Sequence, residues 1–161
     1  MRSIAIKKLI YAAAFTFVLA FNAPTTLAGG AMRNANVSHL VHSGAHPNNA
    51  RFQGATHHFE VHVQEKALSA LAIDLPDDVK MRSGIEVKNQ SGQKIESQVS
   101  VNNRKATVVF SQPVSPDTTI SIDMRGIYTP GYSHNWRYTI AGKMVGINAD
   151  IPLGTVLIQT Y

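Results

Sequence analysis

The residues in this sequence whose type and spacing could support chemistry are the histidines. Six of the seven lie between positions 39 and 62. Imidazole and carboxylate ligands together suit zinc or copper. The segment His58-x-Glu60-x-His62 is therefore the centre of a candidate metal site, to which His39 and His42 could add ligands. The whole group comprises His39, His42, His46, His57, His58 and His62.

The spacing of the central triplet limits what such a site could bind. The β-branched residues around it, Thr56, Val61 and Val63, favour a strand over a helix. On a strand, residues i and i+4 lie about 13 Å apart, so His58 and His62 would not converge on one ion. Only a neighbouring pair that includes the carboxylate between them would be close enough, and a third ligand would have to come from elsewhere.

We therefore expect a solvated polar face rather than a tight zinc or copper site, and we expect no cofactor. His39 and His42 are predicted to lie on opposite faces of a short strand over residues 37–42. If a metal site forms, it should join Glu60 and one histidine of the triplet to a donor from His39 or His42. Because imidazole titrates near pH 6.5, the same cluster could instead sense pH, and the sequence leaves this alternative open.

The sequence carries no motif that indicates an enzyme. It has no G-x-S-x-G, H-E-x-x-H, phosphate-loop or G-x-G-x-x-G pattern. The adjacent carboxylates Asp77 and Asp78 follow Pro76 and are typical of a turn. The chain also has no cysteine, which excludes disulfides, thiolate metal sites and cysteine nucleophiles. We expect a non-enzymatic protein with no catalytic residues.

The elements that would position these histidines are short strands. Several short runs between residue 56 and residue 158 have apolar residues at every second position, most with polar residues between them, as in antiparallel strands that have one face in a core. Turn residues at 89–92, at Asn102-Asn103 and around Pro130 separate the runs. The segment 64–71 has weak helical spacing and is either a short helix or a crossover loop. The pattern predicts an all-β, antiparallel immunoglobulin-like β-sandwich of about 7–9 strands.

The alternation also predicts which side chains point inward between the two sheets. These residues are Phe59, Val61, Leu71, Ile73, Val108, Phe110, Ile120, Ile122, Trp136, Tyr138 and Ile158.

The N-terminus is predicted to be a secretory signal peptide. A basic head with Arg2, Lys7 and Lys8 precedes an uncharged apolar run over residues 9–21, and small residues follow, ending at Ala28. We expect cleavage after residue 28, a flexible leader over 29–36 and a single domain over 37–161, with no membrane span after cleavage. Cleavage leaves twelve basic against ten acidic residues, a net charge of +2. No basic cluster remains, so nucleic acid is not an expected partner.

Five segments of the chain resemble one known family. They are 55–61 (ATHHFEV), 72–76 (AIDLP), 106–110 (ATVVF), 112–122 (QPVSPDTTISI) and 153–161. With them the chain resembles the exported cyanobacterial proteins of the "domain of unknown function 2808" family. The resemblance implies export and a β fold but transfers no site, since His57 and His58 stand where the family is expected to have aromatic residues. In strand order and histidine content there is a weaker similarity to small periplasmic copper-binding β-sandwiches.

These observations predict an exported, non-enzymatic cell-envelope protein, periplasmic or extracellular, that acts as a binding or interaction module. Its partner would be an envelope or extracellular molecule that the sequence does not identify, and its oligomeric state is open. The alternative is a periplasmic copper- or zinc-binding β-sandwich that uses the His39–His62 cluster.

Overall fold

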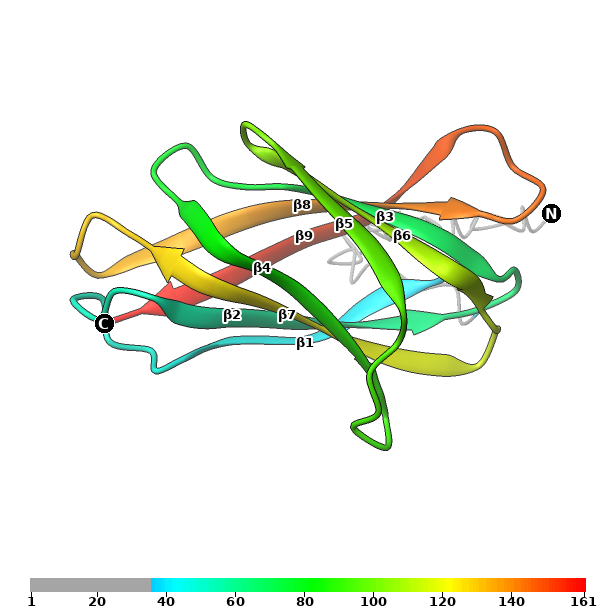
Figure 1. Cartoon of the computed structure of the whole chain (residues 1–161), viewed down its shortest axis with the longest axis horizontal. Coiled ribbons are helices and arrows are strands. Elements are labelled where there is room, and N and C mark those ends of the chain that lie inside the picture. Colours follow the sequence, from blue (N-terminus) through cyan, green and yellow to red (C-terminus); the bar gives the residue numbers. More distant parts are fainter. Residues whose placement is uncertain (1–35) are drawn as a thin grey trace, which may run out of the picture. The chain divides into compact units, whose positions relative to one another are not determined.

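The computed structural model describes residues 36–161, which form nine antiparallel strands and contain no helix, hence none that could cross a membrane (Figure 1). The predicted all-β sandwich is confirmed. The predicted signal peptide (1–28) and nearly all of the leader (29–36) lie outside the described residues and stay predictions. The strands are β1 (His39–His46), β2 (Ala55–Val63), β3 (Leu68–Asp74), β4 (Lys80–Asn89), β5 (Ser97–Asn102), β6 (Lys105–Val114), β7 (Thr118–Tyr128), β8 (His134–Met144) and β9 (Asp150–Thr160).

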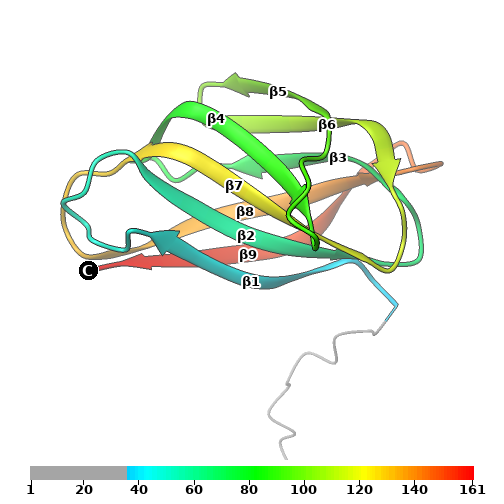
Figure 2. The same cartoon turned by 60° about the horizontal axis from the view of Figure 1, so that its bottom comes forward.

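The strands form two packed sheets, seen as two layers in Figure 2. The four-stranded sheet has the order β1-β2-β7-β4, and the five-stranded sheet has the order β5-β6-β3-β8-β9. Along one side of the sandwich β1 and β9 lie next to each other (Figure 2), and just beyond their ends the Tyr161 amide donates to the Asn48 carbonyl at 2.8 Å. The histidine-rich strands β1 and β2 therefore lie at this side of the four-stranded sheet.

The core lies between the sheets and follows from the period-two pattern. Strand β2 alternates strictly between buried and half-buried residues along its whole length. Strands β7 and β8 do so over most of theirs. Every residue predicted to point inward is buried, including Phe59, Val108, Trp136 and Tyr138. Such a core needs no disulfide, because burial of these side chains stabilises the domain.

Two local predictions from the sequence differ from the structure. The short helix considered for segment 64–71 is wrong, because Leu68 already begins β3, which pairs with strands on both sides. These ladder hydrogen bonds and the complete burial of Leu68 outweigh the weak helical spacing. The turn expected at Asn102-Asn103 is displaced by one residue. Asn102 pairs with Lys105, and Asn103 begins the turn with a φ of 58°, which Asn tolerates.

Candidate functional site

The predicted site residues lie on the outer face of the four-stranded sheet. On β2, His57 points into the core, whereas His58, Glu60 and His62 alternate with buried residues and point outward. Across the ladder, His39 of β1 pairs with His62, and Gly44 of β1 pairs with His58. The side chains of His39, His58, Glu60 and His62 thus lie on two neighbouring strands.

The prediction that His39 and His42 lie on opposite faces is wrong, and a β-bulge is the reason. The register changes between Leu40, which pairs with Val61, and Ser43, which pairs with Phe59. One extra residue on β1 reverses the phase of its alternation. His39 and His42 therefore both lie on the outer face, beside the histidines of β2.

With His42 brought to this face by the bulge, the two strands carry two cross-strand pairs of imidazole rings. The rings of His39 and His62 have their centroids 5.5 Å apart, and those of His42 and His58 are 5.9 Å apart. Gly44 makes room for the second pair, because a Cβ atom at this position would lie 3.0 Å from Cε1 of His58. The remaining candidate of the cluster, His46, pairs with Thr56 at the end of β1 and is exposed.

Hydrogen bonds orient the rings of the first pair. Nδ1 of His39 lies 2.9 Å from the carbonyl oxygen of Val37, and Nδ1 of His62 lies 2.9 Å from Oγ1 of Thr119. A carbonyl only accepts, so the His39 ring donates from Nδ1, and in its neutral form it keeps a lone pair on Nε2. Within residues 36–161, no three His, Asp or Glu side chains lie close enough together to hold a metal ion.

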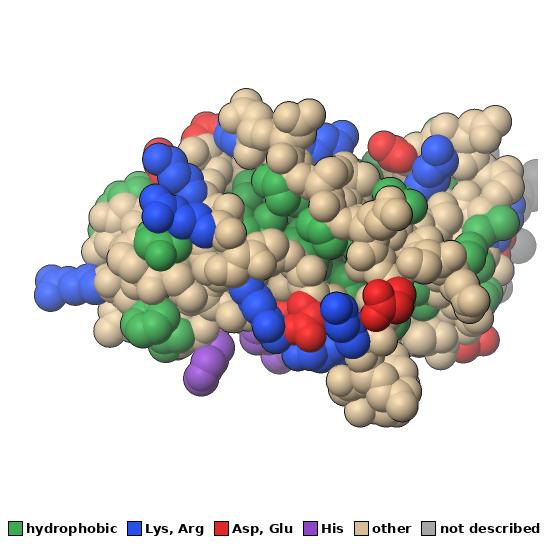
Figure 3. Space-filling model, viewed as in Figure 1, with side chains coloured by type: hydrophobic (Ala, Val, Ile, Leu, Met, Phe, Trp, Pro, Cys, Tyr) green, Lys and Arg blue, Asp and Glu red, His purple; other side chains and the backbone are tan. Residues whose placement is uncertain are grey.

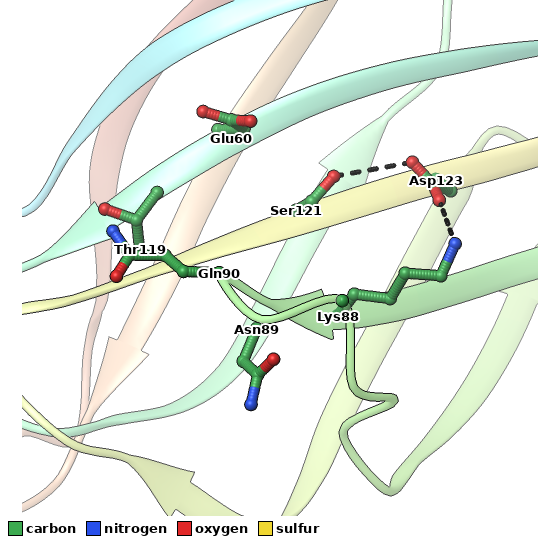
Figure 4. A pocket seen from close by; sticks show the side chains of 8 residues that line it. Glu60, Lys88, Asn89, Gln90, Thr119, Ser121 and Asp123 are labelled. Atoms are coloured by element: carbon green, nitrogen blue, oxygen red, sulfur yellow. Dashed lines mark hydrogen bonds and ion pairs between the residues drawn. The ribbon is translucent and has the colours of Figure 1, made fainter.

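Next to the histidines lies a groove of about 400 Å³, here called the polar groove (Figure 4). Its floor consists of outward residues of β2, β7 and β4, and the turn over residues 89–92 forms one wall. The turn is held by the side chain of Asn89, whose Oδ1 accepts from the amides of Ser91 and Gln93. The lining residues are Glu60, Lys88, Asn89, Gln90, Gly92, Thr119, Ser121 and Asp123.

A network of charges fixes the side chains at one end of the polar groove. Nζ of Lys88 lies 3.0 Å from Oδ2 of Asp123 and 3.8 Å from Oε2 of Glu86, and Arg125 forms an ion pair with Glu86. The hydroxyl of Ser121 donates to Oδ1 of Asp123 at 3.4 Å (Figure 4). In Figure 3 side chains of both charge signs gather along the lower part of this face, with histidines at the margin.

Sequence reasoning missed the residues that β7 and β4 contribute to this groove. The alternation of Thr119, Ser121 and Asp123 with buried isoleucines indicated a strand with one polar face. It gave no signal that β7 would pair with β2, which brings Ser121 opposite Glu60 and Asp123 opposite His58. These contacts depend on the strand order, which period-two alternation does not encode.

The buried histidine has a partner in the other sheet. Nδ1 of His57 lies 2.7 Å from the hydroxyl oxygen of Tyr138, and its Nε2 has no hydrogen-bond partner among the described residues. Burial, with a smaller contribution from the charge of His58, lowers the pKa of His57 to about 4. Burial also raises the pKa of Tyr138 above its usual range. Both groups are therefore neutral at pH 7 and link the two sheets through the core.

Solved structures with a similar fold include surface proteins of bacteria. The N-terminal domain of the Streptococcus gordonii adhesin Sgo0707 (TM-score 0.52, 13% identity) aligns with 78% of this chain and 32% of its own. The bacterial hydrophobin BslA (TM-score 0.52, 10% identity) aligns with 78% of this chain and 95% of its own. The major pilin SpaD of Corynebacterium diphtheriae (TM-score 0.52, 11% identity) aligns with 75% of this chain and 33% of its own. This chain thus spans about a third of the adhesin and pilin chains, and the likeness shows the fold alone.

No curated protein matches the chain by sequence. A family model described as "Protein of unknown function (DUF2808)" matches residues 31–156, which include nearly all of the nine strands. This match confirms the family resemblance that the five sequence segments carry. The chain therefore belongs to the DUF2808 family of proteins of unknown function.

Proposed function

We propose that this protein is an exported, non-enzymatic component of the cell envelope that binds a polar partner through the outer face of its four-stranded sheet. The observation that carries the proposal is the polar groove, whose volume of about 400 Å³ is in the usual range for ligand sites, about 300–1,000 Å³. Carboxylate, hydroxyl, amide and ammonium groups all line it, so the partner should present several hydrogen-bonding groups at once.

The hydrogen bonds of this face support binding rather than catalysis. Thr119 and His62 form a hydroxyl–imidazole pair, but an activated nucleophile also needs a group that orients the base. The ring neighbour of His62 is the imidazole of His39, which supplies no carboxylate for that role. Within residues 36–161 no hydrogen bond joins a histidine ring to a carboxylate.

The proposed location rests on two further observations. The segment before residue 29 has the pattern of a secretory signal, and the fold is similar to that of an adhesin and a pilin, which are surface proteins. The polar groove lies on the outer face of the four-stranded sheet, where an external partner can reach it. The partner we propose is therefore an envelope or extracellular molecule.

A matched pair of variants tests the proposal. Ser121→Tyr places a bulky ring on the floor of the polar groove, and Thr139→Tyr makes the same kind of change at an exposed position of the opposite sheet. The exported protein is incubated with isolated cell envelopes, and the bound fraction is measured after sedimentation. We expect saturable binding that Ser121→Tyr weakens at least tenfold and Thr139→Tyr leaves unchanged. No binding, or equal binding by both variants, would refute it.

A further inference from the structure

We propose that His39 and His62 form a chelating site for a divalent transition-metal ion, bound through the Nε2 atoms of both rings on the outer face of β1 and β2. The site adjoins the polar groove, because Thr119 lines the groove and also contacts His62, but neither of the two ligand histidines lines the groove itself. It is a two-ligand site whose remaining coordination positions are open to water.

The separation of the two rings suits a shared ion. His39 and His62 are direct cross-strand partners, so their Cβ atoms project from the sheet side by side. A metal–nitrogen bond of about 2.0–2.1 Å puts each ring centroid about 3.2 Å from the ion, hence two centroids about 5.2 Å apart at a tetrahedral angle and about 4.5 Å apart at the right angle typical of Cu²⁺. The observed 5.5 Å lies close to the tetrahedral value, and the rings would have to approach by about 1 Å to bind an ion at a right angle.

The hydrogen bonds at Nδ1 are the second observation that supports the site. Histidines that bind metals almost always donate their other ring N–H to a carbonyl, carboxylate or water, which fixes the ring and its tautomer. His39 donates from Nδ1 to the Val37 carbonyl. His62 has Thr119 Oγ1 at 2.9 Å from its Nδ1, and we assign the tautomer in which the ring donates to this hydroxyl. Both Nε2 atoms then carry the lone pair that a metal requires.

The second histidine pair provides an internal comparison. The rings of His42 and His58 are 5.9 Å apart, which is nearly the same separation. Among the described residues, however, neither ring has a hydrogen-bond partner, and His42 is exposed. The separation of the rings therefore does not distinguish the two pairs. The hydrogen bonds at Nδ1 do, because they orient the rings of the first pair alone. If Nδ1 contacts decide affinity, the ion should prefer the first pair.

The chemistry of the ligands determines which ions bind and how strongly. Two neutral imidazoles favour Cu²⁺ over Ni²⁺ and Zn²⁺, following the general order of stability for nitrogen ligands. With only two protein ligands, binding should be much weaker than in closed four-ligand zinc sites. Protons compete for the same nitrogen atoms, so affinity should fall as the pH decreases. Glu60, on the same face of β2, adds negative charge two residues from His62.

The test is a titration of the tag-free exported protein with CuCl₂, NiCl₂ and ZnCl₂ by calorimetry, with electron paramagnetic resonance of the Cu²⁺ form to count nitrogen ligands. We expect one ion per chain and two nitrogen ligands. His39→Ala and His62→Ala should each weaken binding at least tenfold. Thr119→Val, which removes only the contact to Nδ1, should weaken it by about 10-fold or more.

The double variant His42→Ala/His58→Ala is the matched control and should bind within about twofold of the original protein, since the first pair is intact. Circular dichroism and thermal melts of every variant verify the fold. The proposal is overturned if the protein binds no ion, or if the control loses binding while His39→Ala keeps it. Equal affinity in all variants would show adventitious surface binding and would overturn it as well.

Discussion

The neutral, buried His57 should make the stability of the domain depend on pH. Its pKa is about 4 in the folded protein, and the ordinary value of 6.5 applies once the chain unfolds. Between these two values the unfolded chain binds a proton that the folded protein does not, so acid favours unfolding. The contribution is fully present above pH 6.5, decreases as the pH falls, and reaches its lower limit below about pH 4.

The size of this effect follows from the two pKa values. At 1.36 kcal/mol per pH unit, the interval from 6.5 to about 4 corresponds to about 3 kcal/mol of unfolding free energy. That is a large part of the total stability of a domain of this size, which is about 5–15 kcal/mol. Tyr138, the hydrogen-bond partner of His57, remains neutral throughout this range and adds no proton of its own.

The assay is urea unfolding of the protein and of the double variant His57→Phe/Tyr138→Phe at several pH values from 7.5 to 4. Replacing both partners by apolar rings of similar shape leaves no buried polar group unpaired, so the variant should still fold. All other titratable groups are common to both proteins. We expect the original protein to lose about 3 kcal/mol more than the variant over this range. Parallel pH profiles, or a pKa for His57 near 6.5 by NMR, would refute the reasoning.

Three further predictions concern export and packing. N-terminal sequencing of the exported protein should find Gly29, or a residue two or three positions later, as the first residue, and recovery of an intact Met1 form from the cytoplasm would contradict export. Phe110→Ala should cost about 3–5 kcal/mol, and a thermal melt unchanged within about two degrees would show that Phe110 is not part of the core. Trp136→Phe removes the buried donor to Thr160 Oγ1 at 2.9 Å and should cost about 1–3 kcal/mol in urea unfolding.

The sequence predicts the strands and the core well, because both depend on local alternation. On β2 the same period that buries Phe59 and Val61 places Glu60 outside, and no tertiary information is needed. The bulge in β1 could not be predicted in this way, since no residue type around His42 indicates the extra residue. The contact between His57 and Tyr138 joins strands far apart in the sequence and in different sheets. Pairing and register decide such contacts, and alternation specifies neither.

The two outer faces of the sandwich differ in how well their polar groups are oriented before a partner arrives. A depression of about 310 Å³ on the five-stranded sheet is lined by Ala70, Leu71, Ala72, Lys105, Thr107, Val109, Lys143 and Asp150. On the four-stranded sheet, Lys88 is held between Asp123 and Glu86. Groups fixed in advance lose less conformational entropy on binding, so the same number of contacts gives higher affinity there. For this reason Ser121→Tyr, and not Thr139→Tyr, should be the change that weakens partner binding.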